Sequence, residues 1–511
     1  MSNDSVKGIG KVIFSSSLGT LIEWYDFYIF GMLAKTIAVQ FFPEGNDTAA
    51  LLSTLAIFAA GFLVRPFGAL VFGRLGDLIG RKSTFLLTLV LMGSSTFLIG
   101  LVPGYKTIGM AAPLLVLLLR LIQGLALGGE YGGAATYVAE HAPAGKRGYY
   151  TAWIQTTATL GLFVALGIIM TVKSNMSDAA FTSEWGGWRY PFWISILLVG
   201  VSVYIRLKMN ESPLFEKLKE EKKTSVNPLK ESFGHKGNFK MVLLALFGAV
   251  MGQGVIWYTG QFYAQSFLEN TVKIEFMQNR EILLWGIALA TPFFVFFGWL
   301  SDKIGRKWIM LTGMLLGVIF YRPIFGTMLK DADAKEWMKT EFSFIKEDVK
   351  VSMHGTDSVL QVSTQYQTPD KSKFTRVVTD TLTKGRDELQ HIIGADKNAV
   401  YNNKVLNKAT FIKFIFLIWV MIIFVTMVYG PVAAFLVELF PTKIRYTSMS
   451  LPYHIGNGVF GGLVPFIATL LSTTFTKDPL VGLWYPIGVA ALCFVIGALY
   501  LNNTIDKNIN D

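Results

Sequence analysis

The residues of this chain with the clearest capacity for chemistry are a few charged side chains inside long apolar segments. Glu23 and Asp26 are three positions apart, which places both carboxyl groups on one face of a helix, and Arg120 lies in a second segment at a comparable depth. A charge inside a membrane span costs about 2.5–3.5 kcal/mol on insertion scales, so such residues usually face the bundle interior and serve a function. An arginine that faces two carboxyl groups can couple protons to an anion. Protonation of one acid releases the arginine to bind a carboxylate, or substrate binding changes the pKa of the acid.

Polar and aromatic side chains in the second half of the chain are candidates for substrate contacts, although each can equally serve as an interior polar group. Gln253, Trp257 and Gln261 are spaced by four residues and share one helix face. A histidine has an unperturbed pKa of about 6.5, which makes His454 a candidate second proton site as well as a packing residue. The predicted substrate contacts are Gln253, Trp257, Tyr258, Gln261, Tyr429, His454 and Asn457.

Membrane helices must position these residues, because the chain is far more apolar than an average soluble protein. Of its 511 residues, 52% are hydrophobic and only 16% are charged, and the mean hydropathy is +0.45. Apolar runs of about 20 residues are long enough to cross a bilayer. We predict an all-α integral membrane protein with twelve transmembrane helices in two pseudo-symmetric six-helix bundles. The predicted spans are 12–38, 50–72, 84–102, 112–138, 150–172, 190–208, 241–268, 281–300, 308–329, 411–439, 447–472 and 481–502.

A polar decapeptide occurs twice between apolar segments, and the two copies start about 225 residues apart, at Gly73 and Gly298. Both copies fit G-x-L-x-D-x-I-G-R-K, which indicates a repeat unit of half a protein. The aspartate and arginine of each copy can pair across the turn or with a neighbouring helix end. We predict that they act as conformational latches at the cytoplasmic rim.

Further charged pairs near the same rim extend this prediction. Glu438 and Arg445 are expected to act as a latch, and Arg65 and Glu130 as an inner-gate or structural ion pair. The complete predicted set of gate and latch residues is Arg65, Glu130, Asp77, Arg81, Asp302, Arg306, Glu438 and Arg445.

The positive charges indicate membrane topology rather than nucleic-acid binding. The formal net charge is +11, and lysines and arginines gather on the loops of one side of the predicted bundle, including both repeated loops. By the positive-inside rule this side is cytoplasmic and holds both termini. We expect a multi-pass protein of a cell membrane, consistent with a bacterial inner membrane, whose first span is retained rather than cleaved.

Two polar segments interrupt the apolar pattern. Residues 209–240 are basic and helix-prone, which predicts a cytoplasmic linker between an N-terminal bundle, 1–208, and a C-terminal bundle, 241–511. Residues 330–410 are predicted to form a small extracytoplasmic insert between helices 9 and 10. Segments on both sides of Gly355 alternate like strands, so the insert is expected to contain β-structure. A lid, a partner-docking surface and a neutral insertion are all open interpretations of its role.

The repeated loops resemble the signature loops of the major facilitator superfamily, and other motifs narrow the resemblance. Residues 19–28, Gly-Thr-Leu-Ile-Glu-Trp-Tyr-Asp-Phe-Tyr, resemble the first-helix motif of the metabolite:proton symporter family. That family includes transporters of shikimate, 2-oxoglutarate, citrate and proline/betaine. The resemblance covers the chain except the insert and implies alternating access, in which two bundles rock about a midplane site. Further matching segments are 65–68, 120–130, 211–215 and 438–445.

We therefore predict a secondary active transporter that imports a small organic acid or zwitterionic metabolite by proton symport. Glu23 or Asp26 is expected to carry the proton, and Arg120 to transmit its state to the solute. A membrane sensor, a non-coupled facilitator and an exporter are the alternatives. The chain has no P-loop motif, no His-Glu-x-x-His and a single cysteine, which disfavours an enzyme. We expect no cofactor and no metal, the proton gradient as the driving force, and a monomer whose partners are the metabolite, protons and the lipid bilayer.

Overall fold

The computed structural model describes residues 17, 20–22, 24–79, 81–129, 131–207, 228–354, 357–382, 399–440 and 444–503. The chain forms two compact units. The helical unit comprises Met1–Tyr263, Ile287–Tyr321 and Trp419–Asp511. The insert unit comprises Ala264–Gly286 and Arg322–Ile418.

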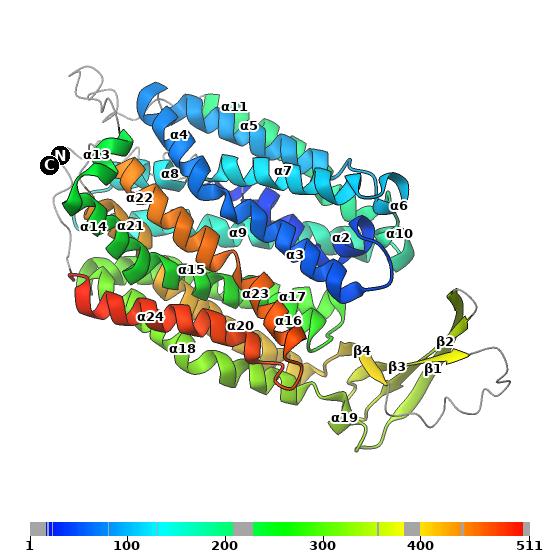
Figure 1. Ribbon diagram of the computed structural model, residues 1–511. Helices are drawn as coiled ribbons and strands as arrows, with labels where there is room; N and C mark the ends of the chain where they lie inside the picture. Colours follow the sequence, from blue (N-terminus) through cyan, green and yellow to red (C-terminus); the bar gives the residue numbers. More distant parts are fainter. Residues whose placement is uncertain are drawn as a thin grey trace. The chain divides into compact units, whose positions relative to one another are not determined.

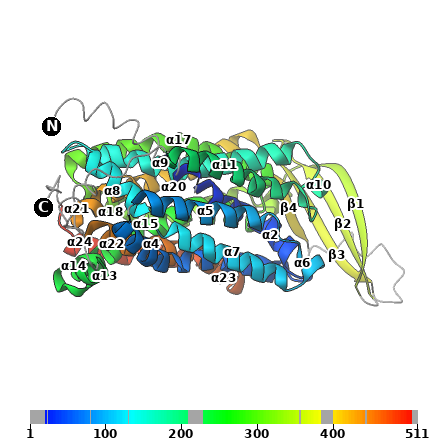
Figure 2. The same cartoon turned by 90° about the horizontal axis from the view of Figure 1, so that it is seen from above.

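The helices of the N-terminal half run side by side in the helical unit (Figures 1 and 2). Residues 24–32 are helical and lead into α2. Glycines and short polar turns end the helices, as between α7 and α8, where Gly128 and Gly129 form a turn. The elements are α2 (Ala34–Phe41), α3 (Asp47–Leu63), α4 (Arg65–Ile79), α5 (Arg81–Ile99), α6 (Tyr105–Ile108), α7 (Ala111–Leu127), α8 (Tyr131–His141), α9 (Arg147–Ser174), α10 (Asp178–Thr182) and α11 (Tyr190–Leu207).

In the described part of the C-terminal half there are three π-helical segments, at Leu246–Val250, Thr259–Tyr263 and Ile455–Gly461. Such segments are rare and occur frequently at functional sites. They interrupt the two helical spans that carry most of the predicted substrate contacts. The α-helices of this half are α13 (Pro228–Gly234), α14 (Lys236–Ala245), α15 (Met251–Tyr258), α16 (Ala264–Asn270), α17 (Phe276–Ile304), α18 (Arg306–Asp331), α19 (Ala334–Trp337), α20 (Lys408–Tyr429), α21 (Val432–Leu439), α22 (Arg445–His454), α23 (Val464–Thr474) and α24 (Trp484–Tyr500).

A helical segment lies at each of the twelve predicted spans in the described part of the chain. Eight helices there are long and apolar enough to cross a membrane, and Leu86–Ile99 and Ala111–Leu127 are shorter apolar helices. The predicted linker falls largely outside the described residues, because 208–227 are not among them; its described part begins with α13. The domain boundaries given above stay predictions.

Close approach between α3 and α7 fixes the position of Arg120. A Cβ atom at Gly124 would lie 1.8 Å from the carbonyl oxygen of Gly61. A Cβ atom at Gly61 would in turn lie 3.1 Å from the carbonyl oxygen of Arg120. The contact at Gly124 leaves no room for a side chain and the one at Gly61 leaves little, so this close approach brings the arginine against the aromatic side chains of α3.

The insert unit contains the predicted β-structure, a four-stranded antiparallel sheet in the order β1-β2-β3-β4. Its strands are β1 (Ser343–His354), β2 (Asp357–Gln367), β3 (Lys373–Leu382) and β4 (Val400–Val405), all within the predicted 330–410. Val362 on β2 pairs with Val349 on β1 and with Val378 on β3, so one face of the sheet carries an apolar row. Leu360 and Val378 form its small core.

The last strand is fastened to the loop between α16 and α17, within the insert unit. Lys404 forms a parallel bridge with Ile274, and its Nζ donates a hydrogen bond of 2.7 Å to the carbonyl oxygen of Ala332. Gln278 accepts from the backbone N–H of Leu406 at 2.7 Å and donates to its carbonyl oxygen at 3.0 Å. These contacts tie β4 to the α16–α17 loop, to the first turn of α17 and to the residue that follows α18, all within the insert unit.

Candidate functional site

Two buried arginines of the N-terminal half lie among aromatic rings. The guanidinium carbon of Arg65 is 4.5 Å from the centre of the Phe27 ring, and that of Arg120 is 4.7 Å from the same ring. The centre of the Phe62 ring is 4.1 Å from the guanidinium carbon of Arg65, and that of the Phe58 ring is 5.0 Å from the guanidinium carbon of Arg120. Ring faces attract cations but leave the donor N–H groups available for an anion.

Arg120 is held by neutral acceptors. Its Nη1 donates to the side-chain oxygen of Gln123, and its Nη2 donates to the carbonyl oxygen of Phe58 at 3.3 Å. Among the described residues Arg120 makes no ion pair with Asp26, and Gln123 donates to the backbone carbonyl of Asp26 at 3.2 Å. Glu23, the other predicted partner of Arg120, lies outside the described residues, so the arrangement of an arginine that faces two carboxyl groups stays a prediction.

Asp26 is buried, with 2% of its surface exposed, and its Oδ1 has no hydrogen-bond partner in the described structure. The desolvation of a buried carboxylate without a cationic partner is costly. A carboxyl group in this position can take up a proton without breaking an ion pair. This geometry agrees with the predicted proton-coupling role of Asp26 but does not test it.

Three of the predicted substrate contacts in the C-terminal half form hydrogen bonds within the protein: Gln253 and Asn457 with each other, and Tyr429 with Tyr453, which was not predicted. Gln253 donates to the Oδ1 of Asn457 at 3.1 Å, and Asn457 donates back to the Oε1 of Gln253 at 2.9 Å. The hydroxyl groups of Tyr429 and Tyr453 are 2.9 Å apart. These amide and phenol pairs link neighbouring helices and have a structural function whether or not they also touch a ligand.

Other predicted contacts are buried polar groups with no hydrogen-bond partner in the described structure. They are Trp257 Nε1, both side-chain polar atoms of Gln261 and both ring nitrogens of His454. Unsatisfied groups of this kind cost about 1–3 kcal/mol each, so native proteins keep few of them outside functional sites. Tyr258 interacts with Arg65, which joins the polar groups of the two halves.

Aromatic rings of the two halves meet around these groups. The centres of the Trp24 and Trp257 rings are 5.4 Å apart, and those of Phe62 and Tyr258 are 5.0 Å apart. On the N-terminal side Phe58 lies 5.3 Å from Phe262. Of the unpartnered polar groups, the indole of Trp257 therefore lies against rings from both halves, namely Trp24 and Tyr429.

A second point of contact between the halves is a tyrosine stack that the sequence analysis did not identify. The Tyr131 and Tyr453 rings are parallel, with centres 3.6 Å apart. Gln155 donates to the Tyr131 hydroxyl at 2.5 Å. Tyr453 also bonds to Tyr429, so the stack connects α8 and α9 to α22 and α20 through side chains.

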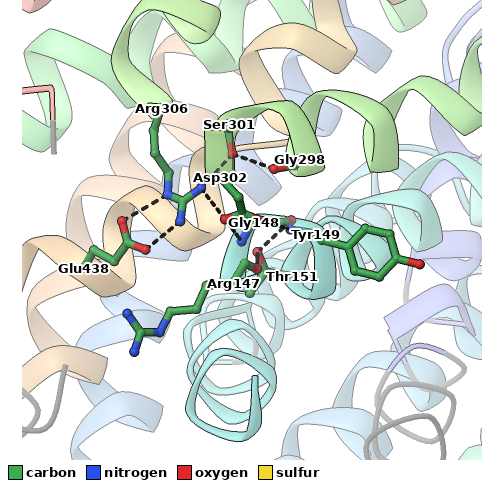
Figure 3. A network of polar contacts seen from close by, with 9 residues as sticks. All are labelled: Arg147, Gly148, Tyr149, Thr151, Gly298, Ser301, Asp302, Arg306 and Glu438. Atoms are coloured by element: carbon green, nitrogen blue, oxygen red, sulfur yellow. Dashed lines mark hydrogen bonds and ion pairs between the residues drawn. The ribbon is translucent and has the colours of Figure 1, made fainter. Parts of the chain in front are cut away.

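The predicted latch of the second repeat is assembled at the end of the bundle where α17 meets α18 (Figure 3). Arg306 bonds to both oxygens of Glu438, at 2.6 and 3.0 Å, and to Asp302 at 2.8 Å. The two oxygens of Asp302 accept the backbone N–H groups of Gly148 and Tyr149, each at 2.8 Å. Because those N–H groups belong to the first turn of α9, this aspartate ties the C-terminal half to a helix N-terminus of the other half.

The remaining gate and latch predictions have different outcomes. Glu438, which the sequence analysis grouped with Arg445, binds Arg306 instead, and Arg445 donates its Nε to the carbonyl oxygen of Phe440 at 3.1 Å. Arg65 lies in the aromatic cluster beside Arg120. Its predicted partner Glu130 and the side chains of Asp77 and Arg81 lie outside the described residues.

Comparison with known proteins agrees with this architecture. The family model described as "Sugar (and other) transporter" matches residues 12–225. The inner membrane metabolite transport protein YhjE of Escherichia coli is 32% identical over 470 residues, which cover 91% of this chain and 88% of the relative. The alpha-ketoglutarate permease of Escherichia coli is 36% identical over 64% of this chain and 73% of the relative. The shikimate transporter of the same organism is 34% identical over 64% of this chain and 74% of the relative.

Solved structures show the same fold at low sequence identity. A structure of the proton:xylose symporter XylE aligns with 99% of this chain and 98% of that chain, with a TM-score of 0.66 and 14% identity. The predicted twelve-helix architecture in two six-helix bundles is confirmed by this likeness together with the helical segments described above.

Proposed function

The chain belongs to the major facilitator superfamily, in the family of metabolite:proton symporters, and we propose that it imports a small organic acid or zwitterionic metabolite together with protons. Its membership makes it a membrane transporter of small molecules. The named inner-membrane relative supports the same location for this chain.

The observation that carries the substrate class is the pair of buried arginines without a carboxylate partner in the described structure. Arg65 and Arg120 are 2% and 0% exposed and both lie over aromatic rings, and Arg120 donates to an amide oxygen and to a backbone carbonyl oxygen. A buried cation is stable only if an anion or a set of dipoles compensates it. A carboxylate of the solute supplies the compensating negative charge. The tyrosine and glutamine side chains of the C-terminal half supply hydrogen bonds to the rest of the solute.

A zwitterion can use the same groups. Its carboxylate binds an arginine, and its cationic end faces an aromatic ring such as that of Trp257, which is 1% exposed and has neighbours on both halves of the bundle. Organic acids and zwitterions therefore require the same arginine, and only a zwitterion also requires the indole of Trp257.

Contacts between the halves support an alternating-access mechanism. Asp302 on α17 bonds to the first turn of α9 and holds one end closed, whereas the rings of Phe262, Phe58 and Tyr28 join the halves beside the site. Opening of the latch would separate the halves at that end while contacts elsewhere hold them together. Asp26 holds the transported proton on the first helix, next to the arginine site.

Uptake into proteoliposomes tests this function. Purified protein is reconstituted, the interior is made alkaline or neutral relative to the outside, and labelled carboxylates and betaines are supplied as a panel. Accumulation that requires the gradient and collapses with a protonophore is the expected result. Accumulation that is independent of the gradient contradicts proton coupling. Binding without accumulation points instead to a sensor with a ligand-binding insert.

A further inference from the structure

Gln123 joins the proposed anion site to the helix that carries Asp26. It is buried on α7, with 1% of its surface exposed. Its side-chain oxygen accepts from Arg120 Nη1, and its Nε2 donates to the Asp26 carbonyl oxygen at 3.2 Å and to Thr96 Oγ1 at 2.8 Å. One amide thus contacts residues of three helices.

The orientation of this amide is fixed by its partners. The hydroxyl of Thr96 donates its own hydrogen to the carbonyl oxygen of Met92 at 3.0 Å, so towards Gln123 it can only accept. The carbonyl oxygen of Asp26 is also only an acceptor, whereas the Arg120 guanidinium is only a donor. Rotating the amide by half a turn would place an NH₂ group against the guanidinium and an oxygen against two acceptors.

A neutral acceptor at this position has a chemical consequence. A carboxylate in place of the amide would form a salt bridge with Arg120 and neutralise the charge that a substrate anion needs. The amide instead holds Nη1 by a hydrogen bond without adding a negative charge, and within the part of the chain that the structure describes no carboxylate pairs with this guanidinium. The bond of Nη2 to the Phe58 carbonyl oxygen is likewise to a neutral acceptor.

We propose that Gln123 is the positioning residue of the anion site: it orients Arg120 without neutralising it and couples that orientation to the Asp26 segment of the first helix. This inference rests on the proposed function in that the anion is taken to be the transported solute. The orientation of Arg120 by Gln123 itself does not depend on transport.

The test compares Gln123→Glu and Gln123→Met with the wild type, and uses Ser95→Ala as the control. Ser95 neighbours Thr96 on α5, is buried, and bonds only to the carbonyl oxygen of Leu91 among its described contacts. Affinity is measured as thermal stabilisation of detergent-purified protein by the carboxylates of the uptake panel, at a series of pH values.

Gln123→Glu is expected to weaken carboxylate affinity about tenfold or more near neutral pH, since a charged bond to Arg120 must be given up when the anion binds. The affinity should recover as the pH falls, because a protonated glutamate is again a neutral acceptor. Gln123→Met should weaken affinity without adding this pH dependence. A Gln123→Glu variant with wild-type affinity at every pH, or with a loss that does not depend on pH, overturns the proposal.

A double-mutant cycle separates this inference from the transport proposal. Melting temperatures of Gln123→Met, Arg120→Met and the double variant are compared without ligand. Coupled effects support the positioning role, and additive effects overturn it. If no carboxylate stabilises even the wild type, the organic-acid proposal fails, and the cycle alone then decides the role of Gln123.

Discussion

Replacing Asp302 with alanine should shift the protein toward conformations in which the latch end is open. Asp302 makes two kinds of contact. Its bond to Arg306 lies within the C-terminal half, so separation of the halves does not require it to break. Its bonds to the Gly148 and Tyr149 N–H groups, each 2.8 Å, cross between the halves and exist only when this end is closed.

The size of the shift follows from the two bonds between the halves. A hydrogen bond to a charged group contributes about 1.5–3 kcal/mol. Two such bonds at the lower value give roughly 3 kcal/mol, and a factor of ten corresponds to about 1.4 kcal/mol. The open population should therefore rise about 100-fold in Asp302→Ala. Asp302→Asn retains one neutral acceptor and should fall between the alanine variant and the wild type.

Cysteine accessibility measures this population. Ala152 on α9 is fully buried, and a Cβ atom at Gly298 of α17 would lie 2.4 Å from its Cβ, so the two helices touch there. An Ala152→Cys probe is placed in a Cys493→Ser background and labelled with a membrane-impermeant maleimide in inside-out vesicles. Asp47→Ala, at an exposed helix start on the opposite end, is the matched control.

We expect faster labelling in Asp302→Ala than in the wild type, an intermediate rate in Asp302→Asn and an unchanged rate in the Asp47→Ala control. An Asp302→Ala variant that folds normally and labels at the wild-type rate would refute the reasoning, because the bonds between the halves would then not determine closure. The same result would remove the latch role assigned to the second repeat.

Three further predictions concern the scaffold. Gly124→Ala should destabilise the helical unit by about 1–3 kcal/mol, because its Cβ atom would meet the Gly61 backbone. Gly167→Ala is the control, since a Cβ atom there has nothing within 4 Å, and it should not destabilise the protein. The melting temperatures of the two variants and the wild type are compared. Replacing residues 341–398 by a short Gly/Ser linker should leave uptake unchanged, since the bonds of Lys404 and Leu406 that anchor the end of the insert are kept. Replacing residues 332–406 removes these bonds and should therefore lower the melting temperature. Burial lowers the pKa of Lys404 to about 8. Between about pH 8 and the ordinary pKa of a lysine, the unfolded state therefore binds more protons than the folded state, and the stability of the insert should rise with pH. Lys404→Met should abolish that rise in hydrogen-exchange protection of β4, and an unchanged pH profile would contradict the assignment.

Much of the scaffold could be predicted because apolar length, repeated motifs and strand alternation are properties of neighbouring residues. The strands on both sides of Gly355 are one example. Pairing of Asp302 with Arg306 or with a neighbouring helix end was also predicted, but neither α9 nor Glu438 was identified as a partner, and the latch role itself stays a prediction. Glu438 is 132 residues from Arg306, and spacing along the chain favoured Arg445 instead. The backbone N–H groups of α9 carry no sequence signal beyond the turn that precedes the helix.

The arrangement around Arg120 was the least predictable part of the site. Charge inside an apolar segment identified Arg120 and Asp26, and attraction between opposite charges suggested that they face each other. A neutral amide gives no such signal, so Gln123 was missed, although it lies three residues after the arginine on the same helix face. The tyrosine stack of Tyr131 and Tyr453 was missed for a similar reason, since it depends on how the two halves meet.

The most direct test of the central claim is to separate proton coupling from solute exchange in Asp26→Asn. Asparagine keeps the size of the buried side chain but cannot take up a proton in this pH range. Proteoliposomes loaded with unlabelled solute are assayed for counterflow, and unloaded ones for accumulation driven by an inside-alkaline gradient, with Glu23→Gln measured in parallel. The account predicts that Asp26→Asn retains counterflow and loses accumulation. Full gradient-driven accumulation in both variants would contradict it.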